Sequence, residues 1–303
     1  MAIRAKKKQE EYNALDAKKN ASNLSDGMLR FNCVRPAANV AYSLLFIALA
    51  LVCVLPVVFV AIISITSEQS IGQYGYSFFP KQLSLSSYRY VWNMRDLVGR
   101  AFLNSVGITV VGTCIGVILT AAMGYTLSRK SYKFRGFFTY FIFIPMLFHG
   151  GTLSSYVVNT QILGLKDTYW ALILPLPTAF GVFILRQAVL SIPNELIDAA
   201  RIDGASRMRI FFRIVLPLSK SAILALAIFT FVGAWNNYTW PLVACTEDSM
   251  KTLPLALNMM KTQYNADVGL TMACAVINFI PPFVFYLFMQ KQFKAGMTMS
   301  GLK

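Results

Sequence analysis

Six long apolar stretches, separated by shorter polar segments, dominate the chain. They cover about 39–65, 102–127, 137–158, 169–190, 222–244 and 269–289. A helix needs about 20 mainly apolar residues to cross the hydrocarbon core of a membrane, and each stretch reaches that length. Buried helices of a soluble protein would need a large polar shell, for which the remaining segments are too short. The pattern therefore predicts an all-α, polytopic membrane protein with six transmembrane helices.

The distribution of Lys and Arg predicts how these helices are oriented. The chain has 303 residues, of which 56% are hydrophobic and 14% charged, and its formal net charge is +15. Of its 28 Lys and Arg residues, 21 lie in four alternate segments: before the first stretch, between the second and third, between the fourth and fifth, and after the last. Cytoplasmic segments carry such an excess, so both termini are expected in the cytoplasm. The positive charge then records topology and does not indicate a nucleic-acid partner.

The basic segment 1–37 has two readings. It could be an arm that binds lipid or RNA. The acids Glu10, Glu11, Asp16 and Asp26 dilute its charge, which favours the simpler reading that these charges only set the topology. The segment is expected to be a cytoplasmic extension preceding a membrane domain at 38–303.

The motifs of common catalytic sites are missing from the sequence. There is no GxxxxGK[ST] loop for ATP, no HExxH and no GxSxG. The five Cys form no CxxC pair, and the single histidine, His149, lies inside an apolar stretch. Few acids lie within the apolar stretches, which disfavours a proton- or sodium-driven carrier. The chain is therefore expected to be no enzyme and to bind no metal or cofactor itself.

The connection at 191–220 reads as helix, break, helix. Ser191 is a candidate N-cap, and Pro193 fits the first turn, where its missing N–H does no harm. Gly204 suits the positive φ that often ends a helix. Ser206 can cap a second short helix, and Pro217 is expected to begin the fifth transmembrane helix.

The first helix of this connection has a face that needs a partner. Leu196, Ala199, Ala200 and Asp203 share that face through their three- and four-residue spacing, and the two alanines permit a close approach. The face could fold back on the membrane surface, or it could dock a partner protein. The residues alone leave both open.

The connection resembles the EAA loop of permeases of type I, binding-protein-dependent ABC importers. The resemblance rests on Asp198-Ala199-Ala200, Asp203-Gly204-Ala205 and Ile214-Val215-Leu216-Pro217. The first acid of the family pattern is usually Glu, so Asp198 keeps the charge with a shorter reach. The carbohydrate-uptake branch is similar at Asn104-Ser105, at Trp235-Asn236-Asn237 and at the C-terminal Gly-Met-Thr-Met-Ser-Gly-Leu-Lys. The tract at 148–165 resembles permeases for complex oligosaccharides and polysaccharide fragments.

The resemblance implies one half of a larger machine in the bacterial cytoplasmic (inner) membrane. A second homologous permease would complete a heterodimer, two ATPase subunits would bind ATP and Mg²⁺, and an extracytoplasmic sugar-binding protein would dock on outer loops at 66–100 and 245–268. Rocking of the helices would alternate access to an oligosaccharide. The residues implied in coupling to the ATPase are Glu195, Asp198, Ala199, Ala200, Asp203, Gly204 and Pro217.

Two groups of residues are candidates for lining the sugar pathway. Polar groups are costly in lipid, and aromatic rings with fixed amides suit sugars. The first group is Trp235, Asn236, Asn237 and Tyr238, and the second is His149, Tyr156 and Asn159. An interfacial aromatic belt is the alternative explanation for the aromatic members.

Other functions remain open at this point. The same machinery could carry a polyamine, an amino-acid derivative or an acidic sugar, since Lys and Arg of the outer loops would attract anions. A channel or scaffold would act without ATPases, and a membrane enzyme is weakened by the missing catalytic motifs.

Overall fold

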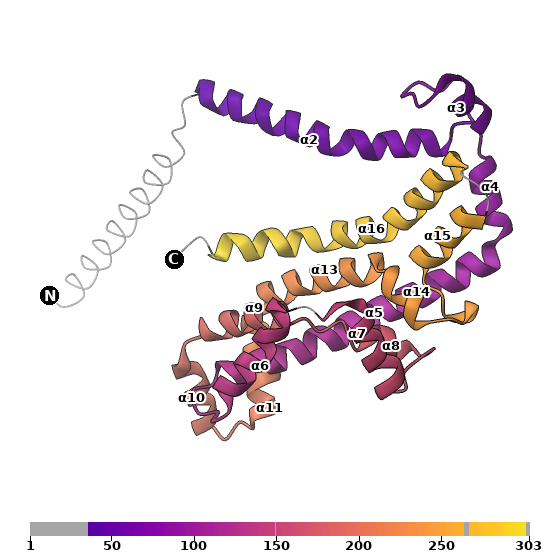
Figure 1. The fold of residues 1–303 in the computed structure, drawn as a ribbon. Coiled ribbons are helices and arrows are strands. Elements are labelled where there is room, and N and C mark those ends of the chain that lie inside the picture. Colours follow the sequence, from indigo (N-terminus) through magenta and orange to yellow (C-terminus); the bar gives the residue numbers. More distant parts are fainter. Residues whose placement is uncertain (1–35, 149, 264–266, 301–303) are drawn as a thin grey trace. The chain divides into compact units, whose positions relative to one another are not determined.

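The computed structural model describes residues 36–148, 150–263 and 267–300, which are almost entirely helical (Figure 1). Within these ranges no strand forms, and the only extended pairing is an isolated antiparallel bridge between Thr66 and Leu83. The chain divides into two compact units, Met1–Phe59 and Val60–Lys303. The described part of the first unit is most of helix α2 (Pro36–Ser64), whose last residues belong to the second unit.

Among the described residues, three helices are long and apolar enough to cross a membrane. They are α2, α5 (Arg95–Ser128) and α16 (Val268–Ser300). The candidate membrane spans within them are Asn39–Ser64, Arg95–Ser128 and Val268–Gln290. They contain the first, second and sixth predicted stretches. Two further candidates are bent pairs of helices, so the described residues hold up to five candidate spans.

The third and fourth predicted stretches are interrupted. The third divides into α6 (Arg135–Leu147), α7 (Gly151–Tyr156) and the π-helix η1 (Val157–Ile162). The fourth divides into α8 (Tyr169–Ile173) and α9 (Ala179–Leu190). Pro175 and Pro177 lie in the second gap, where each lacks an N–H and restricts the residue before it. Thr178 then starts α9 by accepting a hydrogen bond from Gly181 N at 3.1 Å.

The fifth predicted stretch also ends early. Helix α13 (Lys220–Asn236) stops at Asn237, which has extended backbone angles. The side-chain oxygen of Asn237 accepts a hydrogen bond from Trp240 N at 3.1 Å, at the start of α14 (Thr239–Ala244). An amide that caps a helix explains why a continuous apolar stretch contains a turn.

Helix α5 is the centre of the second unit because small residues line one of its sides. Gly112, Gly116 and Gly124 recur at multiples of four, so they share one face. Leu176 packs against the first two glycines, and the backbone of α9 passes close to Gly124. This spacing of small residues is the pattern that lets membrane helices approach closely.

Helix α13 lies between α5 and α16 (Figure 1). Their contact is aromatic: Phe231 stacks on Phe285 with ring centroids 3.8 Å apart, and the edge of Phe102 meets Trp235. Short helices lie toward the N-terminal end of α5, namely α3 (Glu68–Tyr74), α4 (Ser86–Asn93), η3 (Asp248–Met250) and α15 (Leu253–Gln263).

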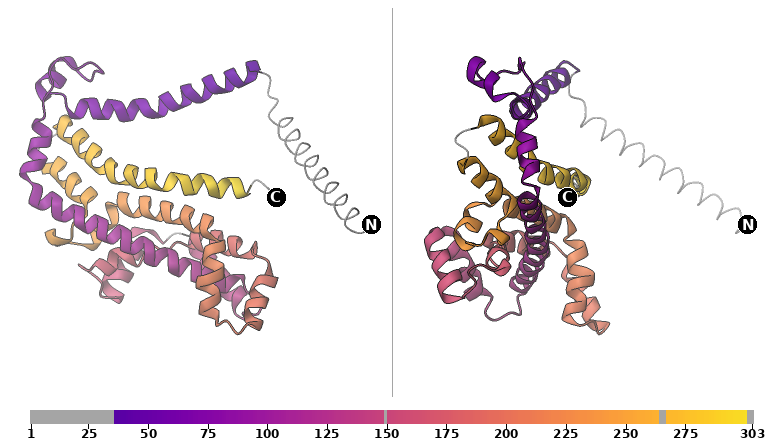
Figure 2. Two further views of the ribbon diagram at one scale, coloured as in Figure 1. Left: turned by 180° about the vertical axis from the view of Figure 1, so that it is seen from behind. Right: turned by 90° about the vertical axis from the view of Figure 1, so that its right-hand side faces the viewer.

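The 191–220 connection lies at the opposite end of the second unit. It contains α10 (Asn194–Ile202), α11 (Arg207–Ile210), the π-helix η2 (Phe211–Val215) and α12 (Leu216–Leu218). Figures 1 and 2 show α10 and α11 at the C-terminal end of α5, far from α15 at its N-terminal end. The 191–220 connection and α15 therefore lie at opposite ends of one long helix.

Candidate functional site

Helix α10 is anchored on one side. Ile197 is only 1% exposed and joins Ile210, Phe211 and Val215 in a core cluster with residues of α5, α9 and α13. Helix α10 thus packs against other helices of the second unit through Ile197, and of the face predicted from the sequence only Ala200 takes part. The predicted cap of α11 is confirmed, since Ser206 Oγ accepts a hydrogen bond from Arg209 N at 3.3 Å.

The start of α10 differs from the prediction. Ser191 is not its N-cap: the residue ends α9, and its hydroxyl donates to the carbonyl oxygen of Ala188 at 2.7 Å. Pro193 precedes the first residue of α10 and supplies no side-chain cap. Its fixed φ still directs the chain into the helix. A serine just before a predicted helix is typical of an N-cap, but Ser191 belongs to the end of the preceding helix, α9.

Gly204 ends α10 in the left-handed conformation that its spacing predicted. Its φ is +76°. Gly204 N donates to the carbonyl oxygen of Arg201 at 3.0 Å, and Ala205 N donates to that of Ala200 at 2.9 Å. These two bonds form a Schellman motif, which satisfies carbonyls at a helix end and needs a residue tolerant of positive φ. The turn fixes the direction in which α10 points.

The other face of α10 is exposed and has no partner within the described chain. Leu196 is 48% exposed and Ile202 is 87% exposed, while Ala200 packs inward against the core cluster. Asp198 makes only a loose ion pair with Arg201 at 3.4 Å. Exposed large apolar side chains beside a carboxylate indicate a docking surface. The exposed residues of this docking face are Glu195, Leu196, Asp198, Ala199, Ile202 and Asp203.

Pro217 lies in a sharp bend. It is an exposed residue of α12, and the axis turns by 81° between Arg207–Leu218 and Lys220–Asn236. Helix α13 begins at Lys220, so the prediction that Pro217 begins the fifth span is wrong by three residues. Because Ser219 separates the two helices, the proline marks the bend and not the entry into the membrane helix.

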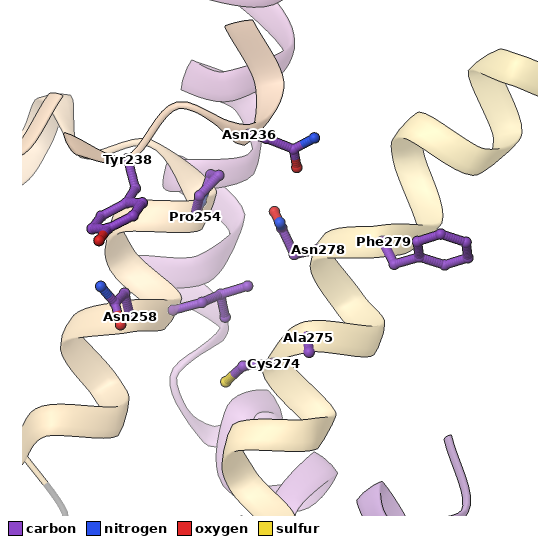
Figure 3. Close-up of a pocket in the computed structure, with 9 residues that line it drawn as sticks. Asn236, Tyr238, Pro254, Asn258, Cys274, Ala275, Asn278 and Phe279 are labelled. Carbon is purple, nitrogen blue, oxygen red and sulfur yellow. The ribbon is translucent and has the colours of Figure 1, made fainter. Parts of the chain in front are cut away.

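At the opposite end, a cavity of about 450 Å³ lies where α13 ends beside α15 and α16. Figure 3 shows the amide of Asn278 pointing toward the end of α13, where Asn236 lies, and the ring of Phe279 pointing away. Asn258 of α15 and Tyr238 complete the polar lining, and the described residues that line this cavity carry no charge. The volume falls in the range of small-molecule sites. Neutral amides and a phenol can donate to and accept from hydroxyl groups. We call this space the amide cavity.

Two of the predicted pathway residues do not line the amide cavity. Trp235 is 1% exposed, and its indole N–H donates to Asn278 O at 3.1 Å and to Asn278 Oδ1 at 3.2 Å. It therefore holds Asn278 in place from within the core. Asn237 caps α14 and lines a different cavity, of about 410 Å³, between α9 and α13. Asn236 and Tyr238 do line the amide cavity.

The second predicted group is not brought together with the first. Tyr156 lines a largely apolar cavity with Thr152, Leu153 and Val243. The amide of Asn159 donates to the carbonyl oxygen of Ser155, one turn earlier, at 2.9 Å. His149 lies outside the described residues. Neither Tyr156 nor Asn159 lines the amide cavity.

Hydrogen bonds tie the loop at 245–253 to α5. Asn104 Nδ2 donates to the carbonyl oxygens of Ser249 at 2.8 Å and Lys251 at 3.1 Å. Ser105 Oγ accepts from Leu253 N at 2.7 Å. The Asn-Ser pair at the start of the second apolar stretch thus fixes the loop that leads into α15, which carries Pro254 and Asn258 of the amide cavity.

Asp167 holds the same loop from the other side. Its carboxylate accepts hydrogen bonds from the backbone N–H and the hydroxyl of Thr246 and from Glu247 N, although its φ of +54° is unusual for a residue with a side chain. The bonds from Thr246 hold the pKa of Asp167 below its ordinary value. Asp167 is therefore a positioning residue for the loop.

Sequence reasoning missed Asn258, Asn278 and Asp167. Asn278 could have been found from the sequence, since it is an amide within the sixth apolar stretch and polar residues inside a membrane are costly. Asn258 lies in a polar connection where an amide is unremarkable. Asp167 acts through its contact with Thr246, which is 79 residues away.

Comparison with known proteins identifies relatives over most of the chain. The chain is 36% identical over 228 residues to the arabinooligosaccharides transport system permease protein AraQ of Halalkalibacterium halodurans, covering 75% of this chain and 82% of that one. It is 34% identical over 265 residues to Protein LplC of Bacillus subtilis, covering 82% and 89%. The polygalacturonan/rhamnogalacturonan transport system permease protein YtcP of the same organism is 32% identical over 270 residues, covering 84% and 94%.

A solved structure shares the fold. It is the crystal structure of a bacterial ABC transporter involved in the import of the acidic polysaccharide alginate, which matches with a TM-score of 0.75 at 24% identity over 84% of this chain and 96% of that chain. Residues 27–299 match the family described as the binding-protein-dependent transport system inner membrane component. This chain therefore belongs to that family of ABC-importer permeases.

Proposed function

We propose that this chain is one permease subunit of an ATP-driven importer that translocates an oligosaccharide delivered by an extracytoplasmic binding protein. The observation that carries the proposal is the exposed docking face of α10, which a buried Ile197 and the Gly204 turn hold at one end of α5. The amide cavity lies at the other end. Coupled transport requires a contact for the ATPase and a site for the cargo on one connected set of helices.

The assembly follows from the family. In our proposal the membrane domain 38–303 crosses the bacterial cytoplasmic membrane six times, with both termini and the 1–37 extension in the cytoplasm. A second homologous permease forms the other half of the pathway. Two ATPase subunits bind ATP and Mg²⁺, and this chain binds no cofactor. The 21-to-7 distribution of Lys and Arg supports this orientation, because it places the 191–220 connection on the side where ATP is available.

The docking face of α10 would be the contact with the ATPase. Asp198 is available for a basic or hydrogen-bonding group because its ion pair with Arg201 is long and exposed. Leu196, Ala199 and Ile202 would supply the apolar contact. Glu195 and Asp203 flank this contact, Ala200 fixes the helix from within, and Pro217 lies in the bend that leads toward α13.

The amide cavity favours a neutral saccharide. Its polar lining is Asn236, Tyr238, Asn258 and Asn278, which together form hydrogen bonds without charge. Among the relatives, AraQ is named for arabinooligosaccharides and YtcP for polygalacturonan and rhamnogalacturonan, so both neutral and acidic cargoes occur. The described lining offers no cation to the carboxylate of an acidic sugar, which is why a neutral saccharide is the favoured cargo.

Reversing the charge at Asp198 tests the coupling role. We expect Asp198→Lys to reduce ATPase stimulation by the loaded binding protein about tenfold or more, since truncating or opposing a charged contact at an interface costs well over 1.4 kcal/mol. Gly204→Val should act similarly, because a β-branched residue is strained at positive φ. The measurement is ATP hydrolysis by the purified complex, with and without binding protein and cargo.

Lys133→Glu is the control. It also reverses an exposed charge in a segment expected to be cytoplasmic, but it lies outside α10. This variant should retain the ATPase subunits through purification and their stimulation by the loaded binding protein. Full ATPase stimulation in Asp198→Lys would refute the coupling role. Flux through liposomes that contain this chain alone would instead support a channel.

A further inference from the structure

A second polar cavity, of about 290 Å³, lies beside α10 and has no role in the proposed cycle. The C-terminal end of α5, the end of α9 and one side of α10 form it. Its residues are Ser128, Arg129, Lys130, Ser131, Val189, Leu190, Asn194, Asp198 and Arg201. Three are cationic and one is anionic, so the cavity is basic.

Arg129 lines this cavity, and its guanidinium has unused hydrogen-bonding capacity. Its Nε and Nη2 atoms are buried and have no hydrogen-bond partner among the described residues. The guanidinium lies over the ring of Tyr125, with 4.7 Å to the ring centroid, which fixes its plane. A buried guanidinium edge without a partner is costly. Arginine offers such edges in a fork that matches the two oxygens of a phosphate or carboxylate.

The remaining side chains complete a site for an anion. Arg201 lies on the cavity wall with its charge only partly offset by Asp198, 3.4 Å away. Lys130 is exposed and free to turn inward, and Ser131 adds a hydroxyl. The cavity is at the lower end of ligand-site volumes, which suits a headgroup and not a whole lipid or an oligosaccharide.

The surroundings indicate where the anion comes from. Arg129 directly follows the apolar helix α5, so it lies at the membrane boundary. Next to it, the ring of Tyr132 stacks on Phe138 with centroids 6.1 Å apart, and Phe134 is 65% exposed. Leu190, 46% exposed, extends the apolar surface from the cavity itself. A basic recess beside exposed aromatic and aliphatic side chains matches a headgroup with its acyl chains.

We propose that the Arg129 cavity binds the phosphate of an acidic phospholipid headgroup of the cytoplasmic leaflet, in contact with the α10 docking helix. The proposal rests on the proposed function only for the side of the membrane, because basic recesses at that face bind anionic headgroups. Since Arg201 and Asp198 lie on both the cavity and α10, a bound headgroup competes with Asp198 for Arg201. The lipid thereby frees Asp198 for its partner.

The test measures lipid retention by the full-length chain, purified with the subunits that accompany it and exchanged into nanodiscs of phosphatidylcholine with or without phosphatidylglycerol. Native mass spectrometry then counts retained phosphatidylglycerol. Arg129→Gln should lower this retention about fivefold, the effect of one cation at an anionic surface. Arg129→Lys keeps the charge but loses the paired N–H donors of the guanidinium. Its phosphatidylglycerol retention should lie between that of the natural chain and that of Arg129→Gln. Lys133→Gln is the control, because Lys133 is a nearby exposed cation outside the cavity.

Equal retention of phosphatidylglycerol by the natural chain and Arg129→Gln would overturn the proposal. So would loss of the ATPase subunits from Arg129→Gln with lipid retention unchanged, which would assign the cavity to the ATPase. Thermal stabilisation by inorganic phosphate equal to that by phosphatidylglycerol would assign it to a free anion. Lipid retention needs no transport, so failure of the import proposal in the Asp198→Lys experiment is a separate result.

Discussion

At the scale of single residues, the glycines of α5 show how close its neighbours lie. A Cβ atom built on Gly124 would lie 2.9 Å from the backbone nitrogen of Arg186 and 3.1 Å from Leu185 Cβ. Backbone atoms of a packed helix cannot turn aside as a flexible side chain can. The glycine therefore sets the distance between α5 and α9.

We expect Gly124→Ala to destabilise the protein by about 1–3 kcal/mol, the usual cost of overpacking. Gly107→Ala is the control in the same helix, because nothing lies within 4 Å of its Cβ position. That variant should be neutral or stabilised by up to about 1 kcal/mol through better helix propensity. Thermal unfolding in detergent measures both. A Gly124→Ala protein as stable as Gly107→Ala would contradict the packing described for α5.

Residue-scale prediction from the sequence succeeded where a local rule decides the structure. Gly204 and Ser206 follow from helix-ending and capping chemistry, which depends on neighbours within a few positions. Trp235 and Asn237 did not follow, because their roles depend on Asn278 and on a helix break. A tryptophan beside asparagines has the same local sequence whether it lines a cavity or fills a core.

At the scale of elements, the amide cavity depends on three helices that meet only in the fold. Asn236 ends α13, Asn258 lies on α15 and Asn278 on α16. The Asn104 and Ser105 side chains hold the loop that introduces α15. The cavity could not be assembled from the sequence, since its three amides span 43 positions and only one belonged to a recognised motif.

We expect Asn236→Ala and Asn258→Ala each to raise the cargo concentration for half-maximal uptake about fivefold, since one hydrogen bond contributes about 1 kcal/mol. Asn237→Ala is the matched control. This variant removes the side-chain oxygen that accepts from Trp240 N. It should lower the melting temperature without changing the cargo concentration for half-maximal uptake. Uptake of labelled cargo by vesicles with loaded binding protein measures the effect. Equal loss of uptake in all three variants would show that the cavity has no special role.

Broken helices are the second element-scale lesson. Three of the six apolar stretches are divided: the third after Leu147, the fourth between Ile173 and Ala179, and the fifth at Asn237. Hydropathy measures only how apolar a stretch is, and it is unaffected by a missing N–H or an amide cap. The prolines in the fourth stretch were visible signals for its break.

At the scale of the whole molecule, the topology predicted from the charge distribution is directly testable. In a background without the native cysteines, we expect a membrane-impermeant maleimide to label Gln73→Cys on intact cells. Ser131→Cys should be labelled only after permeabilisation. Both positions are exposed, so burial does not explain a difference. The reverse result would invert the proposed orientation and remove the 191–220 connection from the side where ATPases act.

The family fold was predictable from the sequence because a short docking loop and a charge pattern identify it. The family match over 27–299 agrees with a resemblance first seen in about ten residues of the 191–220 connection. Some of those residues, such as Asp198 and Ala199, are exposed, whereas Ala200 and Val215 pack into the core cluster. The motif therefore combines an exposed face with the residues that anchor it.

The continuity of α5 has a mechanical consequence. Its 34 residues contain no proline and no break, giving a rod of about 50 Å. One end is bonded through Asn104 to the loop at 249–251, and Gly124 near the other end is pressed against α9. Helix α10 packs through Ile197 against a cluster that includes residues of α5. We therefore expect a displacement of α10 to move the loop at 249–251 as well, because α5 contains no hinge at which the displacement could be absorbed.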